Sequence, residues 1–414
     1  MRTRLSQQER FAWSIVAVLF AGSVINYLDR AVLGVVMPQI RRDLGLSNQE
    51  YGWVVNAFLT AYALSYIVGG RLADRLGCRR MVAITAAFWS LAGVAHACVR
   101  GLGSLALVRA LLGLGEAGFY PAAIRGAAGW FPSKDRAKAI GLLLSALCVG
   151  TLLTPPLVAW VTVRYGWRAS FLVTGSFGFL LIPPWVWLHR RIRRVYGVPD
   201  PDPAKDGLQT NDAATPLARV LRTRKYWCLL AARGCTDGAW YFYLFWMPGY
   251  FQEVRGLSLA TVGQLLWIPY FTAGLGAVVG AWVSSRLIHR GFSVDRGRKS
   301  VLVPAALLGA TGAATCFVPS HVAALAIVAL ALFGHQSWSS NIHTAISEVA
   351  PPAHVAVLYG LTGAAGTLMG ALAQLVIGPV VDAVGYQPVF VAAGAMYLAA
   401  ASFLLAAGKI ERIR

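Results

Sequence analysis

The chain has 414 residues, 57% of them hydrophobic and only 13% charged, and its formal net charge at pH 7 is +20. Water-soluble domains carry about 25% charged residues, so this composition excludes a soluble domain and indicates a membrane protein. The six cysteines include no CxxC pair, and we interpret them as small packing residues rather than as disulfide partners or metal ligands.

Twelve long apolar blocks follow one another along the chain. Each reaches roughly the 20 residues that cross a bilayer as an α-helix. The sequence therefore predicts an all-α membrane protein with twelve transmembrane helices. In chain order the blocks are 11–37, 51–70, 81–99, 102–124, 139–163, 169–188, 226–251, 259–288, 301–319, 321–347, 355–381 and 387–407.

Basic residues are distributed unevenly over the segments between these spans. If the N-terminus is cytoplasmic, the cytoplasmic segments hold 28 of the 37 Lys and Arg residues, and the external loops hold six. This excess follows the positive-inside rule. We therefore expect a multi-pass protein of the cell's inner (plasma) membrane with cytoplasmic N- and C-termini. The positive charge then reports orientation and contact with anionic lipid rather than nucleic acid.

The chain divides near its middle at a basic segment with Pro, Asp and Gly, 190–225, which we interpret as a cytoplasmic linker. It would separate an N-terminal six-helix bundle, 1–189, from a C-terminal one, 226–414. Duplicated six-helix halves are typical of transporters that bind their substrate between the halves. A weak repeat at an offset of 219 residues aligns Gly141, Gly166 and Phe171 with Gly360, Gly385 and Phe390.

Three arginines remain inside the predicted spans, and each has an acidic residue nearby in the sequence. A charged group at the centre of a membrane helix costs roughly 2.5–3.5 kcal/mol, so such residues usually serve a function. Arg109 and Glu116 are seven residues apart on one helix face, which predicts an intrahelical pair. Arg233 and Asp237 are four residues apart and predict a second pair.

The stretch NYLDR (26–30) places Asp29 and Arg30 side by side inside the first span. All of these charges could form purely structural ion pairs. Three arginines that converge on one cavity fit an anionic substrate better. A buried carboxylate whose arginine partner is engaged elsewhere binds a proton more readily, which would supply proton coupling.

The stretch GGRLADRLGCRR (69–80), between the second and third spans, matches the GxxxDRxGxRR motif of the major facilitator superfamily, which the chain resembles. Its charges can latch helix ends together in one conformation and release them in another, so we interpret it as a gating element. A merely solvated basic turn is the alternative. The proposed gating residues are Gly70, Asp74, Arg75, Arg79 and Arg80.

Within that superfamily the chain resembles the anion:cation symporters, which include bacterial hexuronate and aldonate transporters and the vesicular glutamate carriers. The resemblance implies the superfamily's fold, with two pseudo-symmetric six-helix bundles. The stretches that carry it are NYLDR (26–30), RALLGLGEAGFYPAA (109–123), GWFPSKDRAKAIG (129–141), DGAWYFYLFWMPGYF (237–251) and GHQSWSSNIHTAISE (334–348).

The resemblance also implies roles for individual residues. Arg30 would bind the substrate carboxylate, and Asp29 and Glu116 would carry protons. Arg109, which we also place at the substrate site, would hold Glu116 in its ionised form until protonation releases the pair. Tyr62 lies where the family's sugar-acid members have a binding tyrosine.

Sugar acids also need aromatic and hydrogen-bonding side chains, because Tyr and Trp offer an apolar ring with one polar handle. Tyr27 lies about one turn before Arg30, and Trp338 and Asn341 lie in the tenth span. The alternative for the aromatic residues is an anchor at the membrane interface. Further candidates are Trp240, Tyr241, Tyr243, Trp246 and Ser337.

The fifth span departs from the hexuronate-type pattern. Its stretch LLLSALCVG (142–150) has Leu144, Leu147 and Cys148 in place of amides and keeps Ser145 as its polar residue. A site with fewer donors and acceptors rewards hydroxyls less. The substrate could therefore be a less hydroxylated carboxylate, either aromatic or a short organic acid.

We therefore expect a proton-coupled symporter that imports an organic anion, such as a hexuronate or an aldonate, by alternating access. The alternatives are a transporter of a less hydroxylated carboxylate, a drug or metabolite exporter of the same superfamily, and a receptor with a transporter fold. The sequence contains no metal-ligand cluster, nucleophile motif or phosphate loop, so we expect neither an enzyme nor an ATP-driven pump, and no cofactor. The expected partners are a small organic anion, protons and the lipid bilayer, with the chain acting as a monomer.

Overall fold

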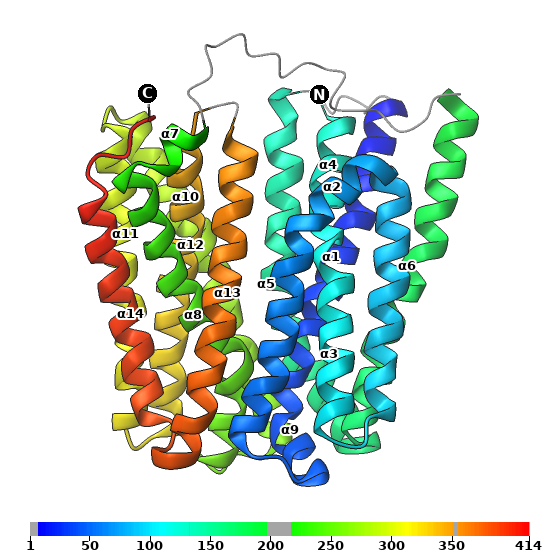
Figure 1. The fold of residues 1–414 in the computed structure, drawn as a ribbon, viewed down its shortest axis with the longest axis vertical. Helices are drawn as coiled ribbons and strands as arrows, with labels where there is room; N and C mark the ends of the chain where they lie inside the picture. Colours follow the sequence, from blue (N-terminus) through cyan, green and yellow to red (C-terminus); the bar gives the residue numbers. More distant parts are fainter. Residues whose placement is uncertain (1–6, 132, 197–216, 352–353, 414) are drawn as a thin grey trace, which may run out of the picture.

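The computed structural model describes residues 7–131, 133–196, 217–351 and 354–413, and every regular element in these ranges is helical. The first half contains α1 (Gln7–Leu44), α2 (Asn48–Ala95), the 3₁₀ helix η1 (His96–Cys98), α3 (Leu102–Ala117), α4 (Phe119–Trp130), α5 (Ser133–Tyr165) and α6 (Trp167–Tyr196). The second half contains α7 (Leu217–Leu221), α8 (Arg224–Glu253), α9 (Leu259–Leu265), α10 (Trp267–His289), α11 (Val294–Ala310), the 3₁₀ helix η2 (Thr311–Phe317), α12 (His321–Val349), α13 (Val355–Val384) and α14 (Gln387–Ala406). Figure 1 shows the two halves as neighbouring groups of roughly parallel helices, with both described chain ends at the same end of the molecule.

Ten helical stretches of the described residues are long and apolar enough to cross a membrane. The other two predicted spans are the first part of α2 and helix α8. Gly77, with a φ of 73°, breaks α2 into two successive spans. Helix α8 is less apolar because it is rich in Tyr and Trp and holds Arg233 and Asp237. With these two, the chain has the predicted twelve transmembrane helices in two six-helix bundles.

The two halves repeat the same local geometry at the predicted offset of 219 residues. Gly166 between α5 and α6 and Gly385 between α13 and α14 both have a φ of 80°. This conformation costs other residues on the order of 1–3 kcal/mol, so glycine fits where one span ends and the next begins. Phe171 and Phe390, five residues further on, are both buried. The repeat is therefore structural, and the bundles are pseudo-symmetric.

The predicted linker, 190–225, begins and ends in helical structure. Helix α6 continues to Tyr196, and both α7 and the first residues of α8 precede residue 226. Residues 197–216 lie outside the described part of the chain. The predicted boundaries of the bundles, 1–189 and 226–414, stay predictions.

The core and the lipid-facing surface are both apolar. The largest fully buried side chains include Trp89 and Trp185 in the first half and Trp246 and Trp338 in the second. Large exposed side chains on the spans are apolar too, such as Leu180 on α6. An apolar exterior is what a protein surrounded by lipid tails requires, since no water solvates it there.

The two bundles are hydrogen-bonded to each other at the end of the molecule opposite the chain ends (Figure 1). Asp382 of α13 accepts from the backbone N–H groups of Asn48 and Gln49, at 3.1 and 2.8 Å, and so caps the start of α2. Gln39 of α1 donates from Nε2 to Gln252 of α8 at 2.8 Å. We call this set of contacts between the bundles the seam.

Two glycines let α2 and α13 approach closely at the seam. A Cβ atom on Gly52 would lie 2.6 Å from the carbonyl oxygen of Gln374, and one on Gly378 would lie 2.6 Å from that of Asn48. A larger residue at either position would push the two helices apart, because both obstacles are backbone atoms. The seam therefore depends on backbone contact as well as on side-chain hydrogen bonds.

Candidate substrate-binding site

A buried ion pair joins α1 to α3. Arg30 donates from Nη2 and Nε to one carboxylate oxygen, Oε2 of Glu116, at 2.9 and 3.1 Å. The exposed fractions of the two residues are only 4% and 1%. Nη2 also lies 3.4 Å from Oδ1 of Asn26, one turn earlier on α1. An anion that takes the Nε and Nη2 donors of this guanidinium has to displace Glu116, because both already point at its carboxylate.

Aromatic rings surround the same guanidinium. The ring centres of Tyr62, Tyr27 and Phe58 lie 4.4, 5.1 and 5.4 Å from the central carbon of Arg30. All three distances lie within cation–π range. Tyr62 also stacks on Tyr66, one turn further along α2, with ring centres 6.0 Å apart. The structure thus brings Tyr27, Tyr62 and Arg30 together, as the sequence predicts.

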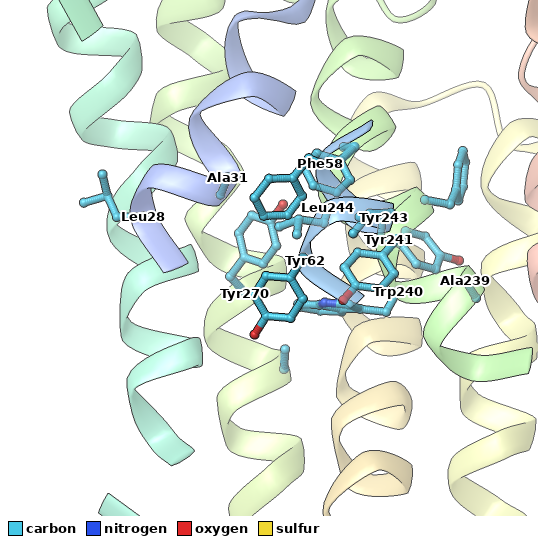
Figure 2. Packing of buried hydrophobic residues seen from close by; sticks show 14 of the residues in the cluster. Leu28, Ala31, Phe58, Tyr62, Ala239, Trp240, Tyr241, Tyr243, Leu244 and Tyr270 are labelled. Carbon is cyan, nitrogen blue, oxygen red and sulfur yellow. The ribbon is translucent and has the colours of Figure 1, made fainter. Parts of the chain in front are cut away.

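Helix α8 brings aromatic residues of the second bundle to the same place. Figure 2 shows Trp240 and Tyr241 of α8 beside Tyr62. Tyr241 also lies within electrostatic range of Arg30. Trp240 stacks on His335 of α12, with ring centres 4.9 Å apart and planes 7° from parallel. The centre of the molecule therefore combines one guanidinium with rings from both bundles, which suits a ligand that has a carboxylate and a carbon skeleton.

The predicted pair between Arg109 and Glu116 is wrong. Seven helical residues span about 10 Å along the axis, whereas Arg30 reaches Glu116 from the neighbouring helix. Arg109 is instead fully buried, with its guanidinium carbon 5.5 Å from the ring centre of Phe171. Within the described part of the chain its three side-chain nitrogens have no hydrogen-bond partner.

Asp29 does not share the partner of Arg30, although the two residues are adjacent. It is 2% exposed, and neither carboxylate oxygen has a hydrogen-bond partner of good geometry among the described residues. Thr174 and Trp89 are its polar neighbours, and Arg109 lies within electrostatic range. Buried polar groups are usually hydrogen-bonded, so two unsatisfied charged groups this close together call for an ion, water or a proton as partner.

The predicted pair between Arg233 and Asp237 is confirmed. Nε of Arg233 lies 3.3 Å from Oδ2 of Asp237, one turn along α8. Nη1 donates to the hydroxyl of Thr362 at 2.9 Å, and the guanidinium carbon lies 5.6 Å from the ring centre of Tyr359. This pair therefore links α8 to α13 inside the second bundle.

Trp338 and Asn341 are both fully buried in α12. The amide of Asn341 accepts from Nη1 of Arg298 at 3.3 Å and donates to the carbonyl of Ser337 at 2.9 Å. Arg298 in turn pairs with Glu348 at 2.8 Å, so Asn341 belongs to a network between α11 and α12. Nε1 of Trp338 has no hydrogen-bond partner among the described residues. Their predicted roles in substrate binding stay predictions.

A family model described as Major Facilitator Superfamily matches residues 19–373. The chain belongs to the Major Facilitator Superfamily. Among its superfamily relatives, the hexuronate transporter of Escherichia coli K12 is 28% identical over 388 residues, which cover 91% of this chain and 89% of that protein. The D-galactonate transporter of Escherichia coli O6:H1 is 29% identical, with 96% of each chain covered. A probable galactarate/D-glucarate transporter of Bacillus subtilis is 30% identical, with 97% of this chain and 93% of that protein covered.

Solved structures show the same superfamily fold. A bacterial homologue of the human lysosomal transporter Spinster, in an inward-facing and occupied conformation, aligns with a TM-score of 0.78 at 18% identity, over 95% of this chain and 96% of that one. The inward-open xylose transporter of Escherichia coli aligns with a TM-score of 0.73 at 18% identity, over 95% of each chain. As a superfamily member, the protein is a multi-pass membrane transporter.

The superfamily motif at 69–80 lies at the bend of α2. Arg75 and Arg80 are exposed there, and Arg79 is half-buried. Gly70 and Asp74 lie in the same helix, but the burial of Gly70 and the side chain of Asp74 fall outside what the structure describes. The predicted latch therefore stays a prediction.

Several residues around these arginines were not predicted from the sequence. Asn26 lies one turn from Arg30, and Phe58 and Tyr66 lie one turn on either side of Tyr62, so helical spacing alone could have indicated them. No such signal exists for residues contributed by other helices, since their pairing depends on how the helices pack. Those residues are Tyr359 and Thr362 of α13.

Proposed function

We propose that this transporter is a proton-coupled symporter that imports an organic anion, a sugar acid such as a hexuronate or an aldonate, by alternating access. It would act as a monomer in the cell's inner membrane, with both termini in the cytoplasm. The observation that carries the proposal is the buried Arg30–Glu116 pair beside Tyr27 and Tyr62. The names of the relatives, which transport hexuronate or galactonate, support the substrate class.

Substrate and proton binding would be coupled through Arg30. Its Nε and Nη2 donors are both given to one oxygen of Glu116. A substrate carboxylate that takes these donors leaves Glu116 as a second buried anion beside it. An unpaired buried charge costs several kcal/mol, and a proton on Glu116 removes that charge. The anion and the proton would therefore occupy the site together.

Asp29 is the second proposed proton site. Neither of its oxygens makes a hydrogen bond of good geometry with a described residue, which makes the ionised form costly to keep buried. Arg109 would stabilise ionised Asp29, because it lies within electrostatic range of that carboxylate. Its side chain makes no hydrogen bond with any described residue and so has no other partner there. When a change of conformation separates Asp29 from Arg109, Asp29 would lose this stabilisation and bind a proton.

The carbon skeleton of the substrate would contact the aromatic rings around Arg30. Tyr62 and Tyr27 on one bundle and Tyr241 on the other offer both apolar faces and hydroxyl groups. Trp338 and Asn341 remain proposed contacts. Asn341 would have to leave Arg298 in order to reach a ligand, so we expect it to act in a different conformation of the cycle.

The second candidate substrate class, a less hydroxylated carboxylate, is favoured by one feature of α5. The hydroxyl of Ser145 donates to the carbonyl of Leu142 at 2.7 Å. The side chain of Leu144 on the same helix is exposed and apolar. Helix α5 therefore has few free polar groups for substrate hydroxyls, and the substrate range has to be measured. A cation exporter is disfavoured, because the carboxylate of Glu116 is already neutralised by Arg30.

Alternating access would require the seam to open. With the termini in the cytoplasm, the seam would lie on the external side, and its contacts would close that side in the present conformation. Asp382, Asn48 and Gln49 would separate when the external side opens. Their hydrogen bonds would then be replaced by bonds to water, which keeps the difference between the two conformations small.

The test is uptake by the purified protein in liposomes, with and without an inside-alkaline pH gradient. Labelled glucuronate and galactonate are the substrates, and benzoate and lactate are the competitors. Gradient-driven accumulation of a sugar acid supports the proposal. Uptake of labelled benzoate or lactate without sugar-acid uptake moves the substrate to the second class. Export of a cationic drug in the same vesicles, without anion uptake, would overturn the proposal.

A further inference from the structure

Four arginine side chains line an open surface cavity of about 360 Å³, and the three on α6 are exposed. Three of them, Arg190, Arg193 and Arg194, lie in the last turns of α6, at the end of the molecule that carries the chain ends (Figure 1). The fourth, Arg79, follows the bend of α2. Among the described residues, no carboxylate lines the cavity.

None of these four arginines forms an ion pair with a described residue. Basic residues elsewhere at the ends of the helices do find carboxylates, such as Arg168 with Asp43 at 2.5 Å and Lys225 with Glu411 at 3.7 Å. Four like charges around one cavity repel one another, and an anion with several acceptor oxygens would neutralise them. The charge of the cavity therefore favours an anionic ligand.

The walls of the cavity are held together by a buried residue. Trp185 of α6 is fully buried and donates from Nε1 to the carbonyl oxygen of Arg79 at 3.0 Å. This bond ties the bend of α2 to α6, so the arginines of the two helices keep their relative positions. Holding the two backbones together lowers the conformational cost of bringing the exposed arginines of α6 and Arg79 onto one anion.

A neighbouring tryptophan indicates where the cavity lies relative to the bilayer. Trp187, one turn before Arg190 and Arg191, is 57% exposed, and the guanidinium carbon of Arg191 lies 5.3 Å from its ring centre. Exposed tryptophans at the ends of membrane helices usually lie at the level of the lipid headgroups. The cavity is thus next to the headgroup region.

We propose that this cavity binds a phosphate group. Guanidinium groups match phosphate oxygens with paired hydrogen bonds, which single ammonium groups do not. The phosphate could belong to the headgroup of an anionic phospholipid or to a free phosphate anion. The site is independent of Arg30, so it concerns a ligand other than the transported substrate. By bridging α6 and the bend of α2, the ligand would stabilise the end of the first bundle.

The test measures binding of two probes to the full chain purified in detergent. The lipid probe is dihexanoyl phosphatidylglycerol, with dihexanoyl phosphatidylcholine as the neutral comparison. The free-anion probe is sodium phosphate, compared with sodium chloride at equal ionic strength. The variant replaces three cavity residues: Arg190→Gln, Arg193→Gln and Arg194→Gln.

The matched control removes three exposed arginines at the same end of the second half: Arg219→Gln, Arg222→Gln and Arg224→Gln. A basic residue near an anionic headgroup changes affinity about fivefold, so the cavity variant should bind at least about tenfold more weakly while the control keeps its affinity. If the cavity variant loses affinity for phosphatidylglycerol alone, the ligand is a lipid. If it loses affinity for inorganic phosphate to the same extent, the ligand is a free anion.

Equal weakening in both triple variants, or no binding of either probe to the unmodified chain, would overturn the proposal. If the cavity variant does not fold, the single variants Arg193→Gln and Arg222→Gln are compared in the same way. The first should weaken binding about fivefold and the second should not.

Discussion

Arg30 gives both Nε and Nη2 to a single oxygen of Glu116, at 3.1 and 2.9 Å, while the other oxygen of Glu116 has no hydrogen-bond partner among the described residues. The pair is therefore buried but incompletely satisfied. A fully satisfied buried pair would resist any change of partner, whereas this one can exchange Glu116 for a substrate carboxylate at a smaller cost. This geometry leads to the following predictions.

The substitution Arg30→Lys should weaken glucuronate binding by roughly 10- to 100-fold, because lysine keeps the charge but loses the guanidinium fork. Calorimetric titration of the purified protein measures the affinity. The control is Arg164→Lys, since Arg164 lies at the end of α5, against the ring of Trp160. Unchanged affinity in the Arg30 variant would remove this residue from the substrate site.

The substitutions Tyr62→Phe and Tyr62→Leu should distinguish the contribution of the Tyr62 ring to anion binding from that of its hydroxyl. Phenylalanine keeps a ring 4.4 Å from the Arg30 guanidinium, whereas leucine loses a cation–π contact of about 0.5–2 kcal/mol. We expect the leucine variant to bind all anions more weakly. The phenylalanine variant should lose affinity for sugar acids only, with benzoate unaffected. Equal behaviour of the two variants toward both ligand classes would contradict this assignment.

The substitution Asp382→Asn should open the seam, because it removes a charged acceptor that caps α2 from the other bundle. Spin labels at Arg100 and Val322, in a variant without the six native cysteines, report the distance between the bundles at that end. The distribution should shift toward longer distances, and Gly378→Val should act in the same direction.

The matched control for the seam is Asp43→Asn, which removes a contact to Arg168 within the first bundle alone. It should leave the spin-label distances unchanged. If Asp43→Asn and Asp382→Asn shift them equally, the contacts of Asp382 do not hold the bundles together.

The substitutions Gly166→Ala and Gly385→Ala should each destabilise the protein by about 1–3 kcal/mol, since both residues have a φ of 80°. No heavy atom lies within 4 Å of the added Cβ at either site, so the cost is conformational. The controls, Gly141→Ala and Gly360→Ala, also meet no atom but lie within α5 and α13, where alanine favours the helix by about 1 kcal/mol. The melting temperature, followed by tryptophan fluorescence, should fall for Gly166→Ala and Gly385→Ala. It should rise for Gly141→Ala and Gly360→Ala.

The features that could be predicted from the sequence are those with a local signal. Apolar blocks long enough to cross a bilayer gave the twelve spans, and the repeat at offset 219 correctly matched Gly166 with Gly385. The pair of Arg233 and Asp237 was predictable because one helical turn separates the two residues. In each case the interacting groups lie on one helix or repeat a pattern along the chain.

The features that could not be predicted depend on how helices pack against one another. Glu116 has Arg109 on its own helix, but its partner is Arg30, which α1 brings to it. Helical spacing shows which residues share a face and leaves open which neighbouring helix covers that face. The contacts of Asn341 with Arg298 and of Asp382 with α2 were missed for the same reason.

The most direct test of the account is the behaviour of Glu116→Gln in proteoliposomes, measured in two modes. Glutamine keeps the shape of the side chain but cannot release a proton. Exchange of labelled for unlabelled sugar acid should therefore continue at a rate close to that of the unmodified protein, while accumulation driven by an inside-alkaline gradient should be lost. Equal loss of exchange and accumulation would show that Glu116 forms a structural ion pair, and would contradict its role in proton coupling.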